Sequence, residues 1–196
     1  KILGSKKTVR TMKRDTFLRY RTKHYVPEAT TVIVAGNVSA EQAVKKVKAY
    51  FGSLPRAHRV AKPPVVDKQR APQVGSKYKE SSQCHFQLGF RGVPVGHKDE
   101  PAIEVLRAVL GQGMSSRLFK KLREEMGVCY YVRATTEYNA DHGKFIIASG
   151  VDNGRIELVL KAIMEELALI KSALVPLVEL AKAKESLLGN MLMELE

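Results

Sequence analysis

The sequence predicts an α+β fold, in which an antiparallel β-sheet is packed by helices on one face. Two observations support this prediction. From residue 81 the chain runs as strand, helix, helix, hairpin, helix and helix, and a hairpin joins antiparallel strands. Each helical segment also carries an apolar stripe, which has to be buried against a common layer. The 196 residues, 44% of them hydrophobic, are enough for one domain or two small ones.

The first predicted elements are a helix, a strand and a second helix. Residues 11–25 predict a basic helix, and its apolar side consists of Met12, Phe17 and Tyr20. The β-branched run over residues 30–35 predicts a strand that is buried on both faces. Ser39 and Gln42 form a capping box that begins the second helix, and Gly52 ends it.

The domain organisation follows from these elements. Residues 1–54 are too few to enclose a core, so we interpret them as the C-terminal part of a first domain. Residues 55–79 contain four prolines among basic residues and predict an extended linker. Residues 80–196 predict most of a second domain. Because the chain lacks an initiator Met and stops inside an apolar-periodic pattern, we expect a piece of a longer protein, truncated at both ends.

The second domain is predicted to begin with a strand over residues 84–93, followed by a helix. Asp99 is expected to cap this helix, Pro101 is tolerated in its first turn, and Gly111 ends it. The apolar face of the helix consists of Ile103, Leu106, Val109 and Leu110.

Another helix and a strand come next. Ser115 or Ser116 is expected to cap the helix, and Gly127 fits the left-handed position after its last turn. The core-facing residues of this helix are Leu118, Phe119, Leu122 and Met126. Residues 128–138 predict a strand, one face of which carries Val128, Tyr130, Val132 and Ala134.

The remaining elements are a hairpin and two helices. Residues 139–143 predict the turn of the hairpin, and residues 144–151 predict its returning strand. Residues 156–170 predict an amphipathic helix. Pro176 opens a last helix that is still running at Leu195.

The formal net charge of +13 raises the alternative of nucleic-acid binding. Residues 1–23 hold nine Lys and Arg against one acid, and residues 55–79 hold seven against one. These two segments carry essentially the whole net charge, so a solvated basic tail and linker explain it better than a nucleic-acid surface. We therefore expect no nucleic-acid partner. We also expect no membrane partner, because no apolar run reaches the length of a membrane span.

We expect neither a metal nor a cofactor in this chain. Zinc binding from a helix needs two histidines four residues apart, and the nearest pair, His85 and His97, is twelve residues apart. Cys84 and His85 are neighbours on a strand and point to opposite faces. Cys129 is expected to be a small buried hydrophobe. The two isolated cysteines favour a reducing compartment, with the cytoplasm ahead of the periplasm and the mitochondrion.

Arg123 and Tyr130 are the candidate catalytic residues. Arg123 lies near the end of a predicted helix, and Tyr130 lies just across the turn at Gly127. An arginine and a tyrosine held together by a rigid turn can hydrogen-bond a carbonyl or a developing oxyanion. The residues alone leave a simpler interpretation open, in which the arginine stabilises the helix end and the tyrosine belongs to the core.

The runs Leu110–Phe119 and Arg123–Tyr130 resemble the pitrilysin/insulinase family of zinc metallopeptidases, which includes the mitochondrial processing peptidase. Shorter stretches extend the resemblance over nearly the whole chain, at residues 24–27, 34–36, 50–55 and 96–99. The resemblance implies an α/β roll and paired halves, in one polypeptide or in a homo- or heterodimer, that close around a peptide substrate. It also implies zinc in the parent or in a partner half, because the family's His-x-x-Glu-His motif would lie upstream of this chain.

By this resemblance, the chain is a segment of a zinc metalloendopeptidase that lacks the zinc site and belongs mainly to the inactive domain. Arg123 and Tyr130 would reach across from the half opposite the zinc, hold the substrate carbonyl and stabilise the tetrahedral oxyanion. The chain alone is expected to be inactive. Two alternatives stay open, namely a non-catalytic structural or assembly subunit of the same fold and, less favoured, a basic nucleic-acid-binding domain.

Overall fold

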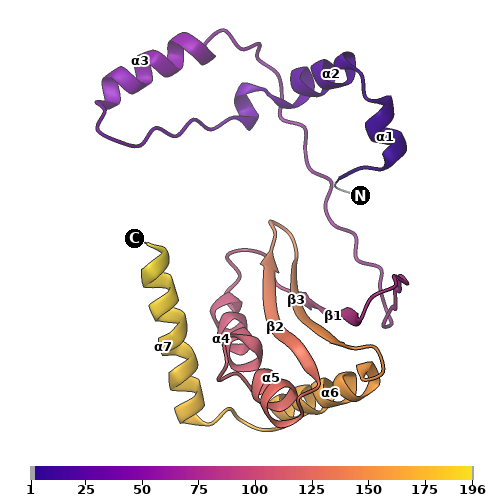
Figure 1. Cartoon of the computed structure of the whole chain (residues 1–196). Coiled ribbons are helices and arrows are strands. Elements are labelled where there is room, and N and C mark those ends of the chain that lie inside the picture. The colour runs from indigo at the N-terminus through magenta and orange to yellow at the C-terminus, as the bar shows by residue number, and fades with distance from the viewer. Residues whose placement is uncertain (1–2, 196) are drawn as a thin grey trace. The chain divides into compact units, whose positions relative to one another are not determined.

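The computed structural model describes residues 3–195 of the chain (Figure 1). The chain divides into two compact units, Lys1–Pro63 and Pro64–Glu196. The division lies inside the segment 55–79, which forms neither helix nor strand. Its prolines and basic residues favour an irregular backbone.

In the described residues of the first unit, the regular elements are all helical. They are α1 (Lys6–Thr11), α2 (Arg14–His24), the 3₁₀ turn η1 (Pro27–Ala29) and α3 (Ala40–Phe51). The helix predicted over residues 11–25 is therefore α2, preceded by a separate short helix. Its predicted apolar side is exposed, at Met12, Phe17 and Tyr20. Ser39 begins α3 by accepting a hydrogen bond from the backbone N–H of Gln42 at 3.2 Å. Within the described residues, the Gln42 side chain does not complete the predicted capping box.

The strand predicted over residues 30–35 does not form. These residues form neither helix nor strand, no described segment pairs with them, and the side chain of Ile33 is 85% exposed. A strand needs neighbouring strands to pair its backbone N–H and C=O groups, and the described part of this unit contains no sheet. The prediction of a buried strand from the β-branched sequence is therefore wrong for this segment.

The second unit is built around a three-stranded antiparallel sheet. The strands β1 (Gln83–Gly92), β2 (Cys129–Tyr138) and β3 (Gly143–Asp152) lie in the order β1-β3-β2, so that β3 is central. β2 and β3 form the predicted hairpin, in which the Asn139 N–H donates to the His142 carbonyl at 2.8 Å. The predicted α+β class and the antiparallel sheet are confirmed.

Helices cover one face of this sheet (Figure 1). They are α4 (Glu100–Gly111), α5 (Arg117–Phe119) with its continuation, the π-helical turn η2 (Lys120–Glu125), then α6 (Ile156–Ser172) and α7 (Leu177–Glu194). The core lies between these helices and the sheet, and its fully buried side chains include Leu110, Leu118, Leu122, Ile147, Val151, Val159 and Ile163. From the predicted apolar face of α4, Ile103, Leu106 and Leu110 pack in this core, whereas Val109 packs in a second cluster with Ala183 of α7. The predicted core-facing residues of the next helix all pack in the main core.

Gly111 lets α4 approach β2 closely. It is the last residue of α4 and is buried. A Cβ atom at this position would lie 2.3 Å from the backbone nitrogen of Ala134, which is far inside van der Waals contact. The glycine, predicted only as a helix stop, therefore also sets the distance between this helix and the sheet.

Two predicted helix caps lack the expected hydrogen bond. Asp99 precedes α4, but its side chain accepts no bond from the first turn. Instead, the Gly96 N–H donates to the Glu100 carboxylate at 2.7 Å, which holds the loop against the helix start. Ser116 precedes α5, and its hydroxyl donates to the Gly113 carbonyl at 2.7 Å rather than accepting from the helix.

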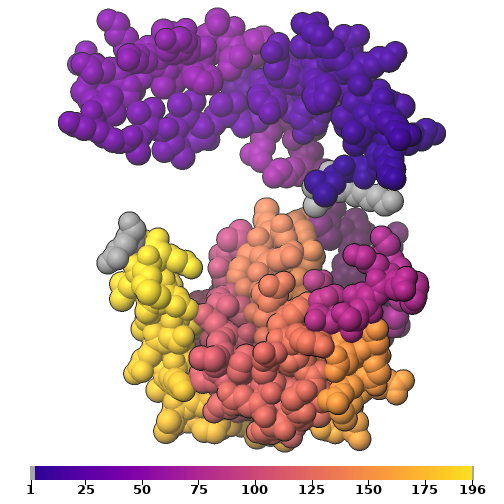
Figure 2. Space-filling model, viewed as in Figure 1, coloured from indigo at the N-terminus to yellow at the C-terminus, as the bar shows by residue number. Residues whose placement is uncertain are grey.

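The last helix, α7, lies beside α4 as a separate column at the side of the second unit (Figure 2). A largely apolar groove of about 310 Å³ lies between the two helices and is lined by Ala102, Val105, Leu106, Val109, Val175, Leu180 and Lys184. None of the helices in the described part of the chain has the length and apolar character needed to cross a bilayer.

Candidate functional site

A β-bulge at the start of β2 decides where Tyr130 points. In the pairing of β2 with β3, Cys129 lies opposite Val151 and Tyr131 lies opposite Gly150, so that Tyr130 is an extra residue. An extra residue shifts the alternation of side chains by one position. The prediction that Tyr130 shares a face with Val128, Val132 and Ala134 is therefore wrong. Those three side chains are buried beneath the helices, whereas Tyr130 is 48% exposed.

The Tyr130 hydroxyl is held by the neighbouring strand. It donates a hydrogen bond of 2.8 Å to the carboxylate of Asp152, the last residue of β3. This hydrogen bond and the negative charge of the carboxylate both disfavour a phenolate, so Asp152 raises the pKa of Tyr130. Tyr130 is thus a neutral hydrogen-bond donor at neutral pH.

Arg123 reaches the same place from the helix before β2. It lies in the π-helical turn, where the Met126 N–H bonds to the Lys121 carbonyl at 3.1 Å. The chain then reverses at Gly127, whose φ of +60° is the left-handed conformation that the sequence predicted. The wide helical turn and the glycine together bring the end of the helix beside the beginning of the strand.

The guanidinium of Arg123 is anchored to the bulge. Its Nη1 donates to the Cys129 carbonyl at 2.9 Å and also to the Tyr130 carbonyl. Its remaining N–H groups, on Nε and Nη2, have no hydrogen-bond partner within residues 3–195, and the side chain is exposed. The predicted proximity of Arg123 and Tyr130 is therefore present, and the contact between them passes through the backbone carbonyl of the tyrosine.

Asp152 was not singled out by the sequence. From the sequence pattern alone, an aspartate at the end of the returning strand would be interpreted as an ordinary surface residue. Its position opposite Tyr130 depends on the register of the hairpin and on the bulge, and neither can be predicted from side-chain periodicity. The one available signal was the length of the hairpin, which brings the start of β2 beside the end of β3.

The cysteines and histidines form no second chemical centre in the described chain. Among residues 3–195, no three His, Cys, Asp or Glu side chains are grouped so that they could hold a metal ion. Cys84 packs against the core and His85 points to the other face of the sheet, as predicted. Burial raises the pKa of the Cys129 thiol, and the charge of Arg123 offsets this only in part. Cys129 is thus a buried neutral thiol.

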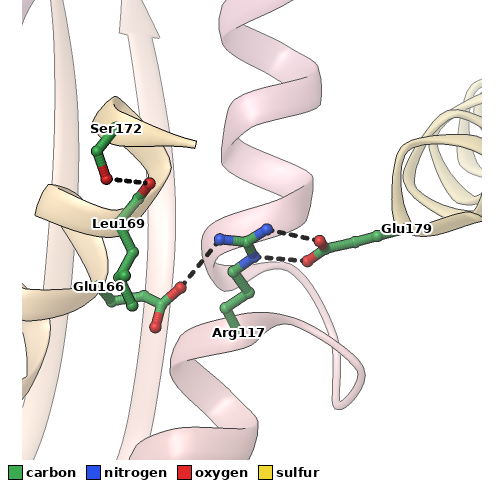
Figure 3. A network of polar contacts seen from close by, with 5 residues as sticks. All are labelled: Arg117, Glu166, Leu169, Ser172 and Glu179. Atoms are coloured by element: carbon green, nitrogen blue, oxygen red, sulfur yellow. Dashed lines mark hydrogen bonds and ion pairs between the residues drawn. The ribbon is translucent and has the colours of Figure 1, made fainter. Parts of the chain in front are cut away.

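Arg117 forms a network of polar contacts in the second unit (Figure 3). Its Nε and Nη2 each donate to the Glu179 carboxylate at 2.7 Å, and its Nη1 donates to Glu166 at 3.1 Å. The bidentate contact with Arg117 holds the pKa of Glu179 below its usual range. All three side chains are largely shielded from solvent, and they tie α5 to α6 and α7. The role of Arg117 is structural.

Comparison with protein families matches residues 11–187 to the model described as the peptidase M16 inactive domain. The uncharacterized zinc protease YmxG of Bacillus subtilis is 32% identical over 198 residues, covering 100% of this chain and 47% of that protein. The chain therefore spans about half the length of the curated relatives it matches.

Two solved structures show the same fold. The crystal structure of a protease from Helicobacter pylori matches with a TM-score of 0.84 at 22% identity, over 97% of this chain and 47% of that chain. A chain of Complex III2 from Candida albicans matches with a TM-score of 0.75 at 16% identity, over 98% of this chain and 48% of that chain.

Proposed function

Because this chain belongs to the M16 peptidase family and matches its inactive domain, we propose that it serves a zinc metalloendopeptidase from the half opposite the zinc. Its contribution is to bind the peptide and to stabilise the oxyanion of the tetrahedral intermediate. The observation that supports this proposal best is the pairing of two exposed donors, Arg123 and Tyr130, at the bulge of β2.

The zinc belongs to the other half of the parent protein or to a partner subunit. Residues 3–195 offer no group of ligands that fits the ion. In that other half, the metal would supply the activated water. The peptide would lie between the two halves, which pair within one polypeptide or in a homo- or heterodimer, and this chain would complete the site only when the halves close.

The two donors suit a carbonyl oxygen that gains negative charge. Tyr130 keeps its proton because Asp152 raises its pKa, and it donates to substrate by turning its O–H away from that carboxylate. Arg123 uses Nη1 to bond the strand, so that its Nε and Nη2 can donate hydrogen bonds to the substrate. Donors of this kind contribute most when they are fixed before the charge develops, and removing one typically costs about 10²–10³ in turnover.

Replacing Arg123 in the full-length parent tests this proposal. Arg123→Ala should lower kcat/KM for a peptide substrate by about 10²–10³ while leaving the zinc content unchanged. Arg19→Ala is the matched control, because Arg19 is an exposed arginine on α2 of the first unit. Unchanged turnover in Arg123→Ala would remove the catalytic role. A parent protein that binds peptides and cleaves none would instead be a non-catalytic subunit.

A further inference from the structure

The face of the sheet opposite the helices, which we call the open face, carries a cluster of three side chains. His85 on β1 and Tyr131 on β2 lie on either side of Gly150 on the central strand. Arg133 lies two residues beyond Tyr131, opposite Ala148. The cluster thus spans all three strands of the sheet.

The three side chains form a fixed platform. The Tyr131 hydroxyl and the His85 Nδ1 are 3.2 Å apart, and the two rings lie 5.8 Å apart at an interplanar angle of 23°. The Arg133 guanidinium lies over the tyrosine ring, 5.7 Å from its centroid. A Cβ atom on Gly150 would come within 2.5 Å of this ring. The glycine therefore lets the ring lie against the strand.

Within the described residues, no acid neutralises the charge of this platform. No carboxylate in residues 3–195 lies within 4.0 Å of the Arg133 guanidinium, whose side chain is exposed. The acids at the two ends of the open face are engaged elsewhere. Glu137 forms an ion pair with Lys144 at 3.0 Å, and Asp152 accepts a hydrogen bond from the Tyr130 hydroxyl. The middle of the face therefore presents a positive charge to solvent.

The platform is continuous with the site at the bulge. Tyr131 directly follows Tyr130, and both aromatic rings project on the open face beside Asp152 and Gly150. From Asp152 to Ala148 the central strand advances four residues, or about 13 Å at a rise of about 3.3 Å per residue. The Arg133 guanidinium, however, lies over the Tyr131 ring, which rests against Gly150, only two residues from Asp152. For a peptide extended along the strand, two to four residues therefore separate Tyr130 from the charge of Arg133.

We propose that the open face selects peptides by charge, with Arg133 on its Tyr131–His85 platform binding an aspartate or glutamate side chain. The acidic residue lies about two to four positions from the carbonyl held at Tyr130. A carboxylate suits Arg133 because a guanidinium donates two parallel hydrogen bonds to it. This proposal rests on the proposed function, because it assumes that this chain binds the peptide substrate and adds which side chain of the peptide it recognises.

Peptide binding to the full-length parent protein, depleted of zinc so that no cleavage occurs, tests the proposal. The probes are labelled alanine-serine peptides that carry Asp, Asn or Lys at successive positions, and fluorescence anisotropy reports their Kd. The wild-type protein should bind the best-placed Asp peptide about two- to five-fold tighter than the Asn peptide, which is the range of an exposed ion pair. This preference should shrink as salt is added.

Charge variants then assign the preference to one residue. Arg133→Gln should remove it, and Arg133→Glu should reverse it in favour of the Lys peptide. Arg70→Gln is the matched control, because Arg70 is an exposed arginine of the linker, and it should keep the wild-type preference. Equal Kd values for the Asp, Asn and Lys peptides at every position, or an unchanged preference in Arg133→Glu, would overturn the proposal.

Turnover by the zinc-loaded protein separates this proposal from the proposed function. Cleavage of the peptides without any charge preference in binding would remove the role of Arg133 and leave the peptidase role intact. Charge-dependent binding without cleavage of any peptide would keep the role of Arg133 and remove the peptidase role.

Discussion

At the scale of single residues, one extra residue in β2 turns Tyr130 from the core to the open face. In this position the hydroxyl meets Asp152, and the carbonyl of the same residue meets Arg123. Tyr130 is therefore held at both ends, by its side chain and by its backbone. A tyrosine in regular alternation would have faced the core with Val128, Val132 and Ala134, where it could not contact a substrate.

The first prediction concerns the ionisation of Tyr130. Asp152→Asn removes the negative charge that disfavours the phenolate, so the pKa of Tyr130 should fall toward the ordinary tyrosine value. Spectrophotometric titration of phenolate absorbance would detect the shift, with Tyr130→Phe identifying the transition that belongs to this residue. Asp152→Glu keeps the charge and should keep the pKa raised. A titration that is identical in Asp152→Asn and in the wild type would show that the hydrogen bond is absent in solution.

At the scale of secondary structure, the network of Arg117 fastens α5 to α6 and α7 (Figure 3). The pKa of Glu179 is lowered in the folded chain, mainly by the hydrogen bonds from Arg117. A carboxylate with a lowered pKa stabilises the fold above its unfolded pKa of about 4.5, and this stabilisation is lost as the pH falls through the folded pKa. Acid should therefore loosen α7.

Glu179→Gln tests this contact. Glutamine is neutral and has only one side-chain oxygen, so it cannot replace the carboxylate that accepts two hydrogen bonds from Arg117. The variant should therefore lose about 1–3 kcal/mol of unfolding free energy at pH 7. The difference from the wild type should shrink well below pH 4.5, where Glu179 is protonated in the wild type as well. Glu165→Gln, at an exposed glutamate of α6, is the control and should change little. Urea unfolding at the two pH values measures both variants, and a pH-independent difference would contradict the account.

The approach of α4 to β2 gives a second prediction at this scale. Gly111→Ala should destabilise the chain by about 3 kcal/mol or more, because the added methyl group would strike the backbone of Ala134. Gly189→Ala in α7 meets open space, and it should stabilise the chain by about 0.5–1 kcal/mol through helix propensity. Thermal unfolding of the two variants provides the measurement. A Gly111→Ala chain as stable as the wild type would mean that α4 can move away from the sheet without loss.

The sequence predicted those features that depend on short-range patterns. The hairpin, the apolar face of α4 and the left-handed Gly127 all follow from residues close together in the chain. The bulge at Tyr130 was missed because two strand registers satisfy the same alternating pattern, and only the packed sheet selects one. The burial of residues 30–35 was wrong because burial depends on partners, which a local pattern does not contain.

At the scale of the whole molecule, the chain consists of two units joined inside an irregular basic segment. The later part of this segment is fastened to the second unit, since the Val65 N–H donates to Asp141 at 2.8 Å and Arg91 pairs with Asp67. The stretch before it is exposed and irregular. A single family model nevertheless spans residues 11–187 and so covers both units.

Limited digestion with trypsin tests this division. The first cuts should fall after Arg56 and Arg59, which are exposed and outside any helix or strand. Lys62 should resist, because proline follows it. The product should be a stable fragment that contains the whole sheet, identified by mass spectrometry. Equally early cuts within the sheet would contradict the division into two units.

The binding of a phosphinic peptide to the full-length parent protein tests the central claim most directly. The phosphinate group is tetrahedral and anionic, so it mimics the oxyanion of the tetrahedral intermediate. The substrate peptide instead carries a planar, neutral carbonyl. Tyr130→Phe should weaken binding of the phosphinate by about 10²-fold, with a much smaller change for the substrate and an unchanged zinc content. Equal affinity of the wild type and Tyr130→Phe for the phosphinate would contradict a role for Tyr130 in stabilising the oxyanion.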